Sequence, residues 1–109
     1  MAWVYLLLAG FIEIGWPLGL KVSQMPGRFW QGIAIALSGG AVSGLLLWLA
    51  QREIAIGTAY AVWTGIGAAG TFAVGILWFG DSASPARVAS AALIVAGIIG
   101  LRLTHSALE

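Results

Sequence analysis

The sequence predicts an all-α integral membrane protein, a single domain of four transmembrane helices. Of its 109 residues, 61% are hydrophobic and 8% are charged, whereas a soluble domain carries about 25% charged residues. A soluble fold of this length leaves too much surface in water to hide so many apolar side chains. The chain also contains four stretches that approach the roughly 20 apolar residues of a membrane-spanning helix. The lipid bilayer is the environment that this composition fits.

The four expected helices cover about residues 2–20, 29–50, 57–79 and 85–103. Charged residues, Pro and Gly mark the short breaks between them. Because such short connections join neighbours, consecutive helices should lie antiparallel. The first stretch has an acid in its interior and no basic leader, so we expect a retained helix and not a signal peptide.

The same composition argues against several classes of function. The chain has no cysteine, which removes disulfides, thiol chemistry and Cys-based metal sites. Its one histidine, His105, lies in the tail, where we expect a solvated side chain. A net charge of +1 disfavours a nucleic-acid partner. With no nucleophile–base pair, phosphate loop or metal cluster in the sequence, we predict neither an enzyme nor a cofactor, and we assign no function to the terminal Leu108 and Glu109.

The first expected helix carries Glu13, the one acid or base clearly inside a predicted span. A charge at the centre of a membrane helix costs about 3 kcal/mol on insertion scales, and such residues are functional by default. The alternative is a structural role, in which Glu13 is a polar clamp that holds two helices together. A carboxyl in apolar surroundings can hold a proton or a cation but not comfortably both. We therefore predict that cation binding at Glu13 releases protons.

The neighbours of Glu13 on its helical face leave room for a ligand. Gly10 lies one turn before it and Trp16 one turn after it. Trp16 offers an indole N–H to a carboxylate and a ring face to a cation, although it could instead be an interfacial anchor. Pro17 lacks a backbone donor and should kink the helix just past the site.

The second and third helices bring polar and aromatic groups to the same depth. Ser43, among the small residues of the second, could offer a hydroxyl to Glu13 or to a substrate. Tyr60 and Trp63 share a face of the third helix, where they either pack or wall a cation pocket. Glycines at 65 and 67 follow, and they allow close helix packing, a hinge, or both.

The fourth helix is predicted to be a packing element. Ser84 followed by Pro85 resembles an N-cap with Pro at the first helical position. Ser90 and Gly97 lie seven residues apart on a helix with no ionisable residue in its middle. We interpret this helix as a contact between two copies of the chain.

The basic residues are almost evenly divided between the two sides of the membrane. One side receives Arg52 and Arg102 with the amino terminus, and the other receives Lys21, Arg28 and Arg87. Since Lys and Arg in short loops set orientation, two against three gives almost no bias. The count permits an antiparallel homodimer of dual topology, and it also permits a topology decided by something else.

Taken together, these motifs resemble a known family over essentially the whole chain. Four short helices, Glu13 in the first and residues 59–67 (AYAVWTGIG) in the third resemble the small multidrug resistance transporters. Residues 91–100 (AALIVAGIIG) resemble the fourth helix of that family. The spacing of Glu13 and Trp16, three residues apart, resembles the guanidinium-exporter subtype more specifically. The quaternary-ammonium subtype lacks this tryptophan.

The resemblance implies a multi-pass protein of the bacterial cytoplasmic (inner) membrane that forms an antiparallel, dual-topology homodimer. Two copies of Glu13 would share one site and bind protons or guanidinium in turn. The residues implied to support the substrate are Gly10, Trp16, Ser43, Tyr60 and Trp63. The dimer contact would lie around Ser90 and Gly97, with Ser90 where the multidrug branch has glycine. Pro17 departs from the alanine of some members.

Guanidinium fits this residue set because it is planar, carries N–H donors in a fork that matches carboxylates, and stacks on aromatic rings. Two other functions stay open on the sequence alone. One is a polyspecific exporter of larger hydrophobic or quaternary ammonium cations in the same fold. The other is a non-transporting membrane subunit in which Glu13 clamps helices. A paired chain of opposite topology, in place of a second copy, also stays open.

Overall fold

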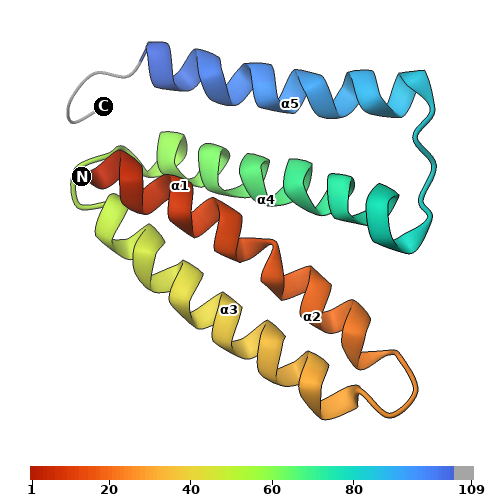
Figure 1. Ribbon diagram of the computed structural model, residues 1–109. Helices are drawn as coiled ribbons and strands as arrows, with labels where there is room; N and C mark the ends of the chain where they lie inside the picture. The colour runs from red at the N-terminus through yellow and green to blue at the C-terminus, as the bar shows by residue number, and fades with distance from the viewer. Residues whose placement is uncertain (105–109) are drawn as a thin grey trace.

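The computed structural model describes residues 1–104, which fold into helices joined by short turns (Figure 1). The helices are α1 (Ala2–Glu13), α2 (Gly15–Ser23), α3 (Phe29–Ala50), α4 (Ile56–Phe79) and α5 (Pro85–Leu103). Successive α1 and α2 form one rod of 22 residues, and α3, α4 and α5 have 22, 24 and 19. At about 1.5 Å per residue, these lengths suit a hydrocarbon core of about 30 Å. The described part of the chain thus contains four apolar helices of membrane length, whereas His105, Leu108 and Glu109 lie outside it.

The first rod is broken immediately after Glu13. The N–H of Ile14 donates to the carbonyl of Phe11, three residues back, at 3.3 Å. Pro17 has no N–H, so the carbonyl of Glu13 cannot receive the usual bond from four residues ahead. The break at Ile14 is the kink expected from Pro17, placed one turn before the proline itself. Beyond it α2 continues to Ser23, past the expected end at residue 20. A lysine such as Lys21 can extend its charge toward water while its backbone stays helical.

Local sequence also explains the turn between α4 and α5. Gly80 has φ 72°, a left-handed conformation that suits glycine and ends α4. The side chain of Ser84 accepts the N–H of Arg87 at 3.4 Å, and Pro85 begins α5. The predicted N-cap of the fourth helix is thereby confirmed.

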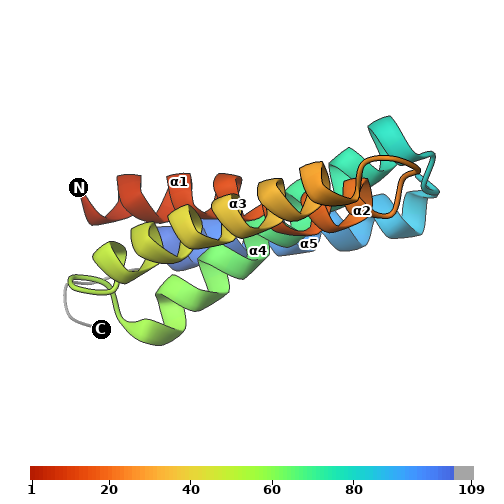
Figure 2. The same ribbon diagram turned by 90° about the horizontal axis from the view of Figure 1, so that it is seen from below.

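The rods lie side by side in a flattened layer, in the order α3, first rod, α4, α5 (Figure 1). Its Cα atoms extend over 47 × 34 × 16 Å, and the flat shape is visible after a 90° turn (Figure 2). The α2 and α3 backbones approach closely because Gly19 and Gly32 face each other without side chains. α1 packs against both α3 and α4, whereas α5 packs against α4. A single layer leaves broad apolar surfaces for lipid or another chain.

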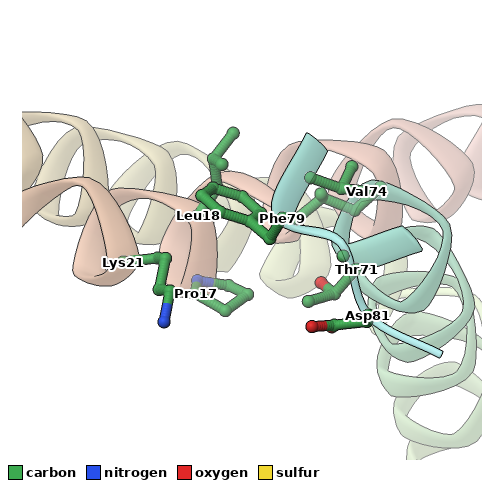
Figure 3. Close-up of a pocket in the computed structure, with 9 residues that line it drawn as sticks. Pro17, Leu18, Lys21, Thr71, Val74, Phe79 and Asp81 are labelled. Atoms are coloured by element: carbon green, nitrogen blue, oxygen red, sulfur yellow. The ribbon is translucent and has the colours of Figure 1, made fainter. Parts of the chain in front are cut away.

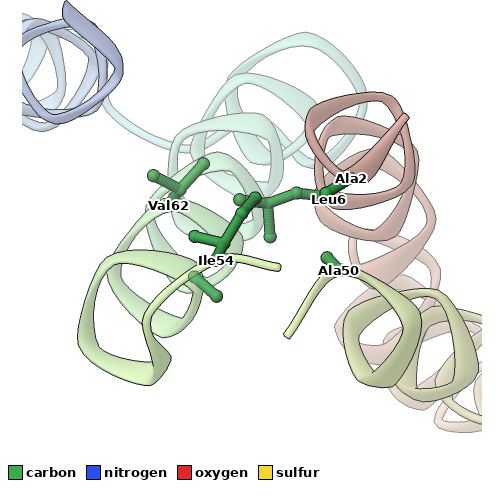
Figure 4. Packing of buried hydrophobic residues seen from close by; sticks show 6 residues of the cluster. Ala2, Leu6, Ala50, Ile54 and Val62 are labelled. Carbon is green, nitrogen blue, oxygen red and sulfur yellow. The ribbon is translucent and has the colours of Figure 1, made fainter. Parts of the chain in front are cut away.

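The buried core lies at one end of the layer, where α1 begins and α3 turns into α4. It consists of Ala2, Leu6, Ala50, Ile54, Ala59 and Val62 (Figure 4). Leu6 and Val62 are fully buried there. No residue of α5 is buried within the described structure. The bundle is therefore tightly packed at the chain's start and more open elsewhere.

Candidate functional site

A cavity of about 410 Å³ lies beside Glu13, between the first rod and α4. It is lined by Glu13, Trp16, Pro17, Tyr60, Trp63, Thr64, Gly67, Ala68 and Thr71. Residues from both sides of the Ile14 break and from about three turns of α4 therefore meet in one place. Four of the side chains expected to surround a cation, those of Glu13, Trp16, Tyr60 and Trp63, are among them.

The Glu13 side chain rests on Gly67 of α4. A Cβ atom at position 67 would lie 3.1 Å from Cγ of Glu13, which is tighter than most real contacts, and 3.5 Å from its Cβ. Gly67 is buried and Glu13 is half-buried. No hydrogen bond or ion pair to the Glu13 carboxylate forms among residues 1–104. The glycine thus makes room for a carboxylate that is open to a ligand.

Trp63 is held in place by a chain of two hydrogen bonds. Its indole Nε1 donates to Oγ of Ser43 at 2.8 Å, and that hydroxyl donates to the carbonyl of Ala9 at 2.7 Å. Ser43 is completely buried and does not line the cavity. Its hydroxyl therefore positions Trp63, and in this structure it serves neither Glu13 nor the cavity directly. The Ser43 hydroxyl makes both hydrogen bonds because burying a hydroxyl without partners would cost folding free energy.

The aromatic wall is completed by two partly exposed rings. The rings of Tyr60 and Trp63 lie 5.6 Å apart between centroids, inclined by 54°. Trp16 crosses over Gly40 of α3, where an added Cβ would lie 3.3 Å from its Cε3 atom. Tyr60 is 56% and Trp16 41% exposed, large fractions for residues on the cavity wall. Part of this wall therefore faces outward from the single chain.

Two of the expected glycine roles take a different form in the structure. Gly10 is buried outside the cavity, and an added Cβ would lie 2.7 Å from Cβ of Ile66. It therefore lets α1 and α4 approach closely. A Cβ added at Gly65 would likewise lie 2.9 Å from Cδ1 of Ile98, so Gly65 lets α4 and α5 approach closely. Since α4 is continuous through Gly65 and Gly67, a hinge at these glycines stays a prediction.

The expected dimer contact lies on the exposed rod. The hydroxyl of Ser90 donates to the carbonyl of Ala86 within α5, at 2.9 Å. A Cβ added at Gly97 would meet nothing within 4 Å. Both positions are thus free to contact another molecule, and their role at a dimer interface stays a prediction.

The sequence interpretation missed Thr71 and Ala68, which also line the cavity. Thr71 lies four residues beyond Gly67 and seven beyond Thr64, so it continues the same helical stripe. Extending that stripe by one turn would have found it. The Oγ1 atom of Thr71 is buried without a hydrogen-bond partner in the described residues.

Comparison with known proteins covers nearly the entire chain. The family model described as Small Multidrug Resistance protein matches residues 1–94. The "Guanidinium exporter" of Citrobacter freundii is 52% identical over 106 residues, which is 96% of this chain and 100% of that protein. The protein of the same name from Yersinia pseudotuberculosis serotype I (strain IP32953) is 52% identical over 103 residues, 94% of this chain and 98% of its own. That of Salmonella typhimurium (strain LT2) is 49% identical over 104 residues, with 95% and 98% covered.

Proposed function

The chain belongs to the small multidrug resistance protein family, and from this premise we propose that it is a proton-coupled exporter of guanidinium. The observation that carries the proposal is the Glu13 carboxylate, which has no protein partner among residues 1–104 and lies in a cavity walled by aromatic rings. The relatives named guanidinium exporters match this chain nearly end to end. Their bacterial origin supports the bacterial cytoplasmic membrane as the location.

The cavity offers what guanidinium requires. The carboxylate of Glu13 can accept two N–H donors of the planar cation, a geometry that strengthens both bonds. The rings of Tyr60 and Trp63 provide faces on which such a cation stacks. Because Ser43 holds the indole of Trp63, that wall is preorganised before the cation arrives.

Proton coupling follows from the chemistry of one carboxyl group. A protonated Glu13 has no charge to attract the cation, and an ionised Glu13 in an apolar surrounding attracts either a proton or a cation. Occupation by one therefore expels the other. Alternating exposure to the two sides of the membrane would convert this exclusion into exchange transport.

We further propose that the working unit is an antiparallel homodimer in which two copies of Glu13 share the site. The flat single layer, the outward-facing rings of Trp16 and Tyr60, and the uncovered α5 all support a second chain. The even division of basic residues supports insertion in both orientations. A second Glu13 would give the site two carboxylates, so that two protons could replace one bound cation.

Glu13 as a mere helix clamp finds no support in the geometry. A clamp requires a hydrogen-bonding or charged partner on the facing helix. The Glu13 side chain lies against Gly67 of α4, which has no side chain, and its carboxylate has no such partner among residues 1–104. The experiment below distinguishes guanidinium export from the alternative, export of larger hydrophobic cations.

The test is uptake of guanidinium into proteoliposomes under an imposed pH gradient. We expect gradient-driven uptake that Glu13→Gln abolishes, and Glu53→Gln is the matched control because Glu53 is an exposed acid in the α3–α4 turn. Preference for tetraphenylphosphonium over guanidinium would favour the exporter of hydrophobic cations. Transport of neither cation would contradict the proposed function.

A further inference from the structure

A second cavity, of about 230 Å³, lies where α2 and α4 approach the loop that leads to α5. Its polar lining consists of Lys21, Thr71 and Asp81 (Figure 3), and Pro17 and Gly75 also line it. Pro17 and Thr71 also line the Glu13 cavity. The two cavities are therefore neighbours, and the outer one lies between Glu13 and the end of the helices. Its volume far exceeds the roughly 10–15 Å³ that one water needs.

The backbone holds Asp81 at this cavity. Gly80 turns the chain back in the left-handed conformation, and the N–H of Asp81 donates to the carbonyl of Gly75 at 3.0 Å. The Asp81 side chain then lies over Gly75, where an added Cβ would overlap Oδ2 and lie 3.1 Å from Cγ. Gly75 is buried. A glycine turn and a glycine notch together aim one carboxylate over the last turn of α4.

Thr71 supplies a hydroxyl without a partner. Its Oγ1 atom is buried and makes no hydrogen bond within the described residues. Such a group is costly unless something binds it. Figure 3 shows Thr71 and Asp81 on the same side of the cavity. A hydroxyl with two free lone pairs and a carboxylate, from two residues that line one cavity, are acceptors suited to a cation with several N–H donors.

Lys21 lines the cavity from α2, yet no ion pair joins it to Asp81 among residues 1–104. The carboxylate of Asp81 is therefore not neutralised by a direct contact. The ammonium of Lys21 opposes the approach of any other cation, and its long side chain can reach toward the carboxylate or toward water. The outer cavity thus holds one attracting and one competing charge.

We propose that this cavity is an outer binding site for the transported cation, a small planar ion with N–H donors, on its way to or from Glu13. This inference rests on the proposed function and adds a second stop to it. The carboxylate of Asp81 receives the cation, the hydroxyl of Thr71 accepts one more of its donors, and Lys21 weakens its hold. In an antiparallel dimer each membrane face has one such site.

The test compares the concentration dependence of guanidinium uptake in proteoliposomes between variants. An interaction of this kind, partly exposed to water, is worth about fivefold in apparent affinity. We expect Asp81→Asn to raise KM about fivefold, with the maximal rate within about twofold of wild type, and Asp81→Glu to restore most of the loss. Lys21→Gln is expected to lower KM because it removes the competing charge. Glu53→Gln, with the same charge change in the other loop, should leave KM unchanged.

An unchanged KM in Asp81→Asn would overturn the outer site, and so would a lower maximal rate at unchanged KM, which indicates only a helix-end role. If Asp81→Asn fails to assemble, Lys21→Gln decides, and an unchanged KM in that variant overturns the inference. Failure of the proposed function is recognised separately, since wild-type protein would then not transport guanidinium at all. In that case the outer site falls with it.

Discussion

The two ends of the helical layer are built in opposite ways. At the end where α1 begins, Leu6 and Val62 are fully buried among alanines and Ile54 (Figure 4). Beyond the Ile14 break, α2 leaves with α3 while α4 runs with α5 (Figure 1), and the cavities at Glu13 and Asp81 lie between them. One end therefore holds the helices together, and the other contains the two cavities in which we propose that a cation binds.

The difference follows from side-chain size along the same helices. The packed end combines the branched side chains of Leu6, Ile54 and Val62 with alanines, and together they fill the contact between rods. The open end uses glycines, where the backbone of one helix directly contacts a neighbouring helix. The side chain of Glu13, for example, lies against the backbone of Gly67. In a membrane, where lipid is as apolar as leucine, close contact through small residues is a principal source of helix association. The molecule can thus be stable at both ends while it keeps a cavity at one.

The largest expected effect is a loss of stability when a cavity is introduced at the packed end. Replacing Leu6 by Ala removes a fully buried side chain and should lower the free energy of unfolding by about 2 kcal/mol or more. Thermal unfolding in detergent measures it. Leu77→Ala is the control, since Leu77 is 74% exposed. Equal losses in the two variants would show that the packed end does not hold the structure together.

A methyl group at the open end should affect transport more than stability. In Gly67→Ala the new Cβ would lie 3.1 Å from Cγ of Glu13, which displaces the carboxylate. We expect guanidinium uptake to fall about tenfold, the rate equivalent of about 1.4 kcal/mol, with little change in melting temperature. Gly44→Ala, where nothing lies within 4 Å, should transport normally. Normal uptake by Gly67→Ala would contradict the placement of Glu13 on this glycine.

A smaller effect is expected from the link between Ser43 and Trp63. Ser43→Ala removes the acceptor of the indole N–H and should cost about 1 kcal/mol of cation binding, or about fivefold in Kd. Ser38→Ala on the same helix is the control, because its hydroxyl bonds only to carbonyls of its own helix. Direct titration of guanidinium binding measures both variants. An unchanged affinity in Ser43→Ala would mean that Trp63 needs no anchor.

The part of this arrangement that the sequence predicted is the part governed by periodicity. Hydropathy alone indicated four membrane-length helices, and helical spacing placed Tyr60 and Trp63 on one face. The cost of an isolated acid in lipid led us to Glu13, which lines a cavity in the structure and whose functional role stays a prediction. The name shared by the relatives agrees with the cation that Trp16 suggested.

The remainder depends on which helices meet, and spacing within one helix does not contain that information. The bond from Ser43 to Ala9 joins residues 34 apart in sequence, and it redirects a hydroxyl that had been expected to face Glu13 or the substrate. The outer cavity likewise combines Lys21 from α2 with Asp81 from a distant loop. Pro17 indicated a kink in the first rod. The kink lies at Ile14 because the carbonyl that loses its N–H donor is that of Glu13, one turn before the proline.

The central claim, that Glu13 holds either a proton or the cation, is tested most directly by guanidinium binding to purified protein across pH 5 to 9. The account predicts that affinity rises with pH over part of this range, by up to about tenfold per unit for each proton displaced, and that binding releases protons into weakly buffered solution. Glu13→Gln should remove both effects. Binding by wild-type protein that is independent of pH, with no proton released, would contradict the account.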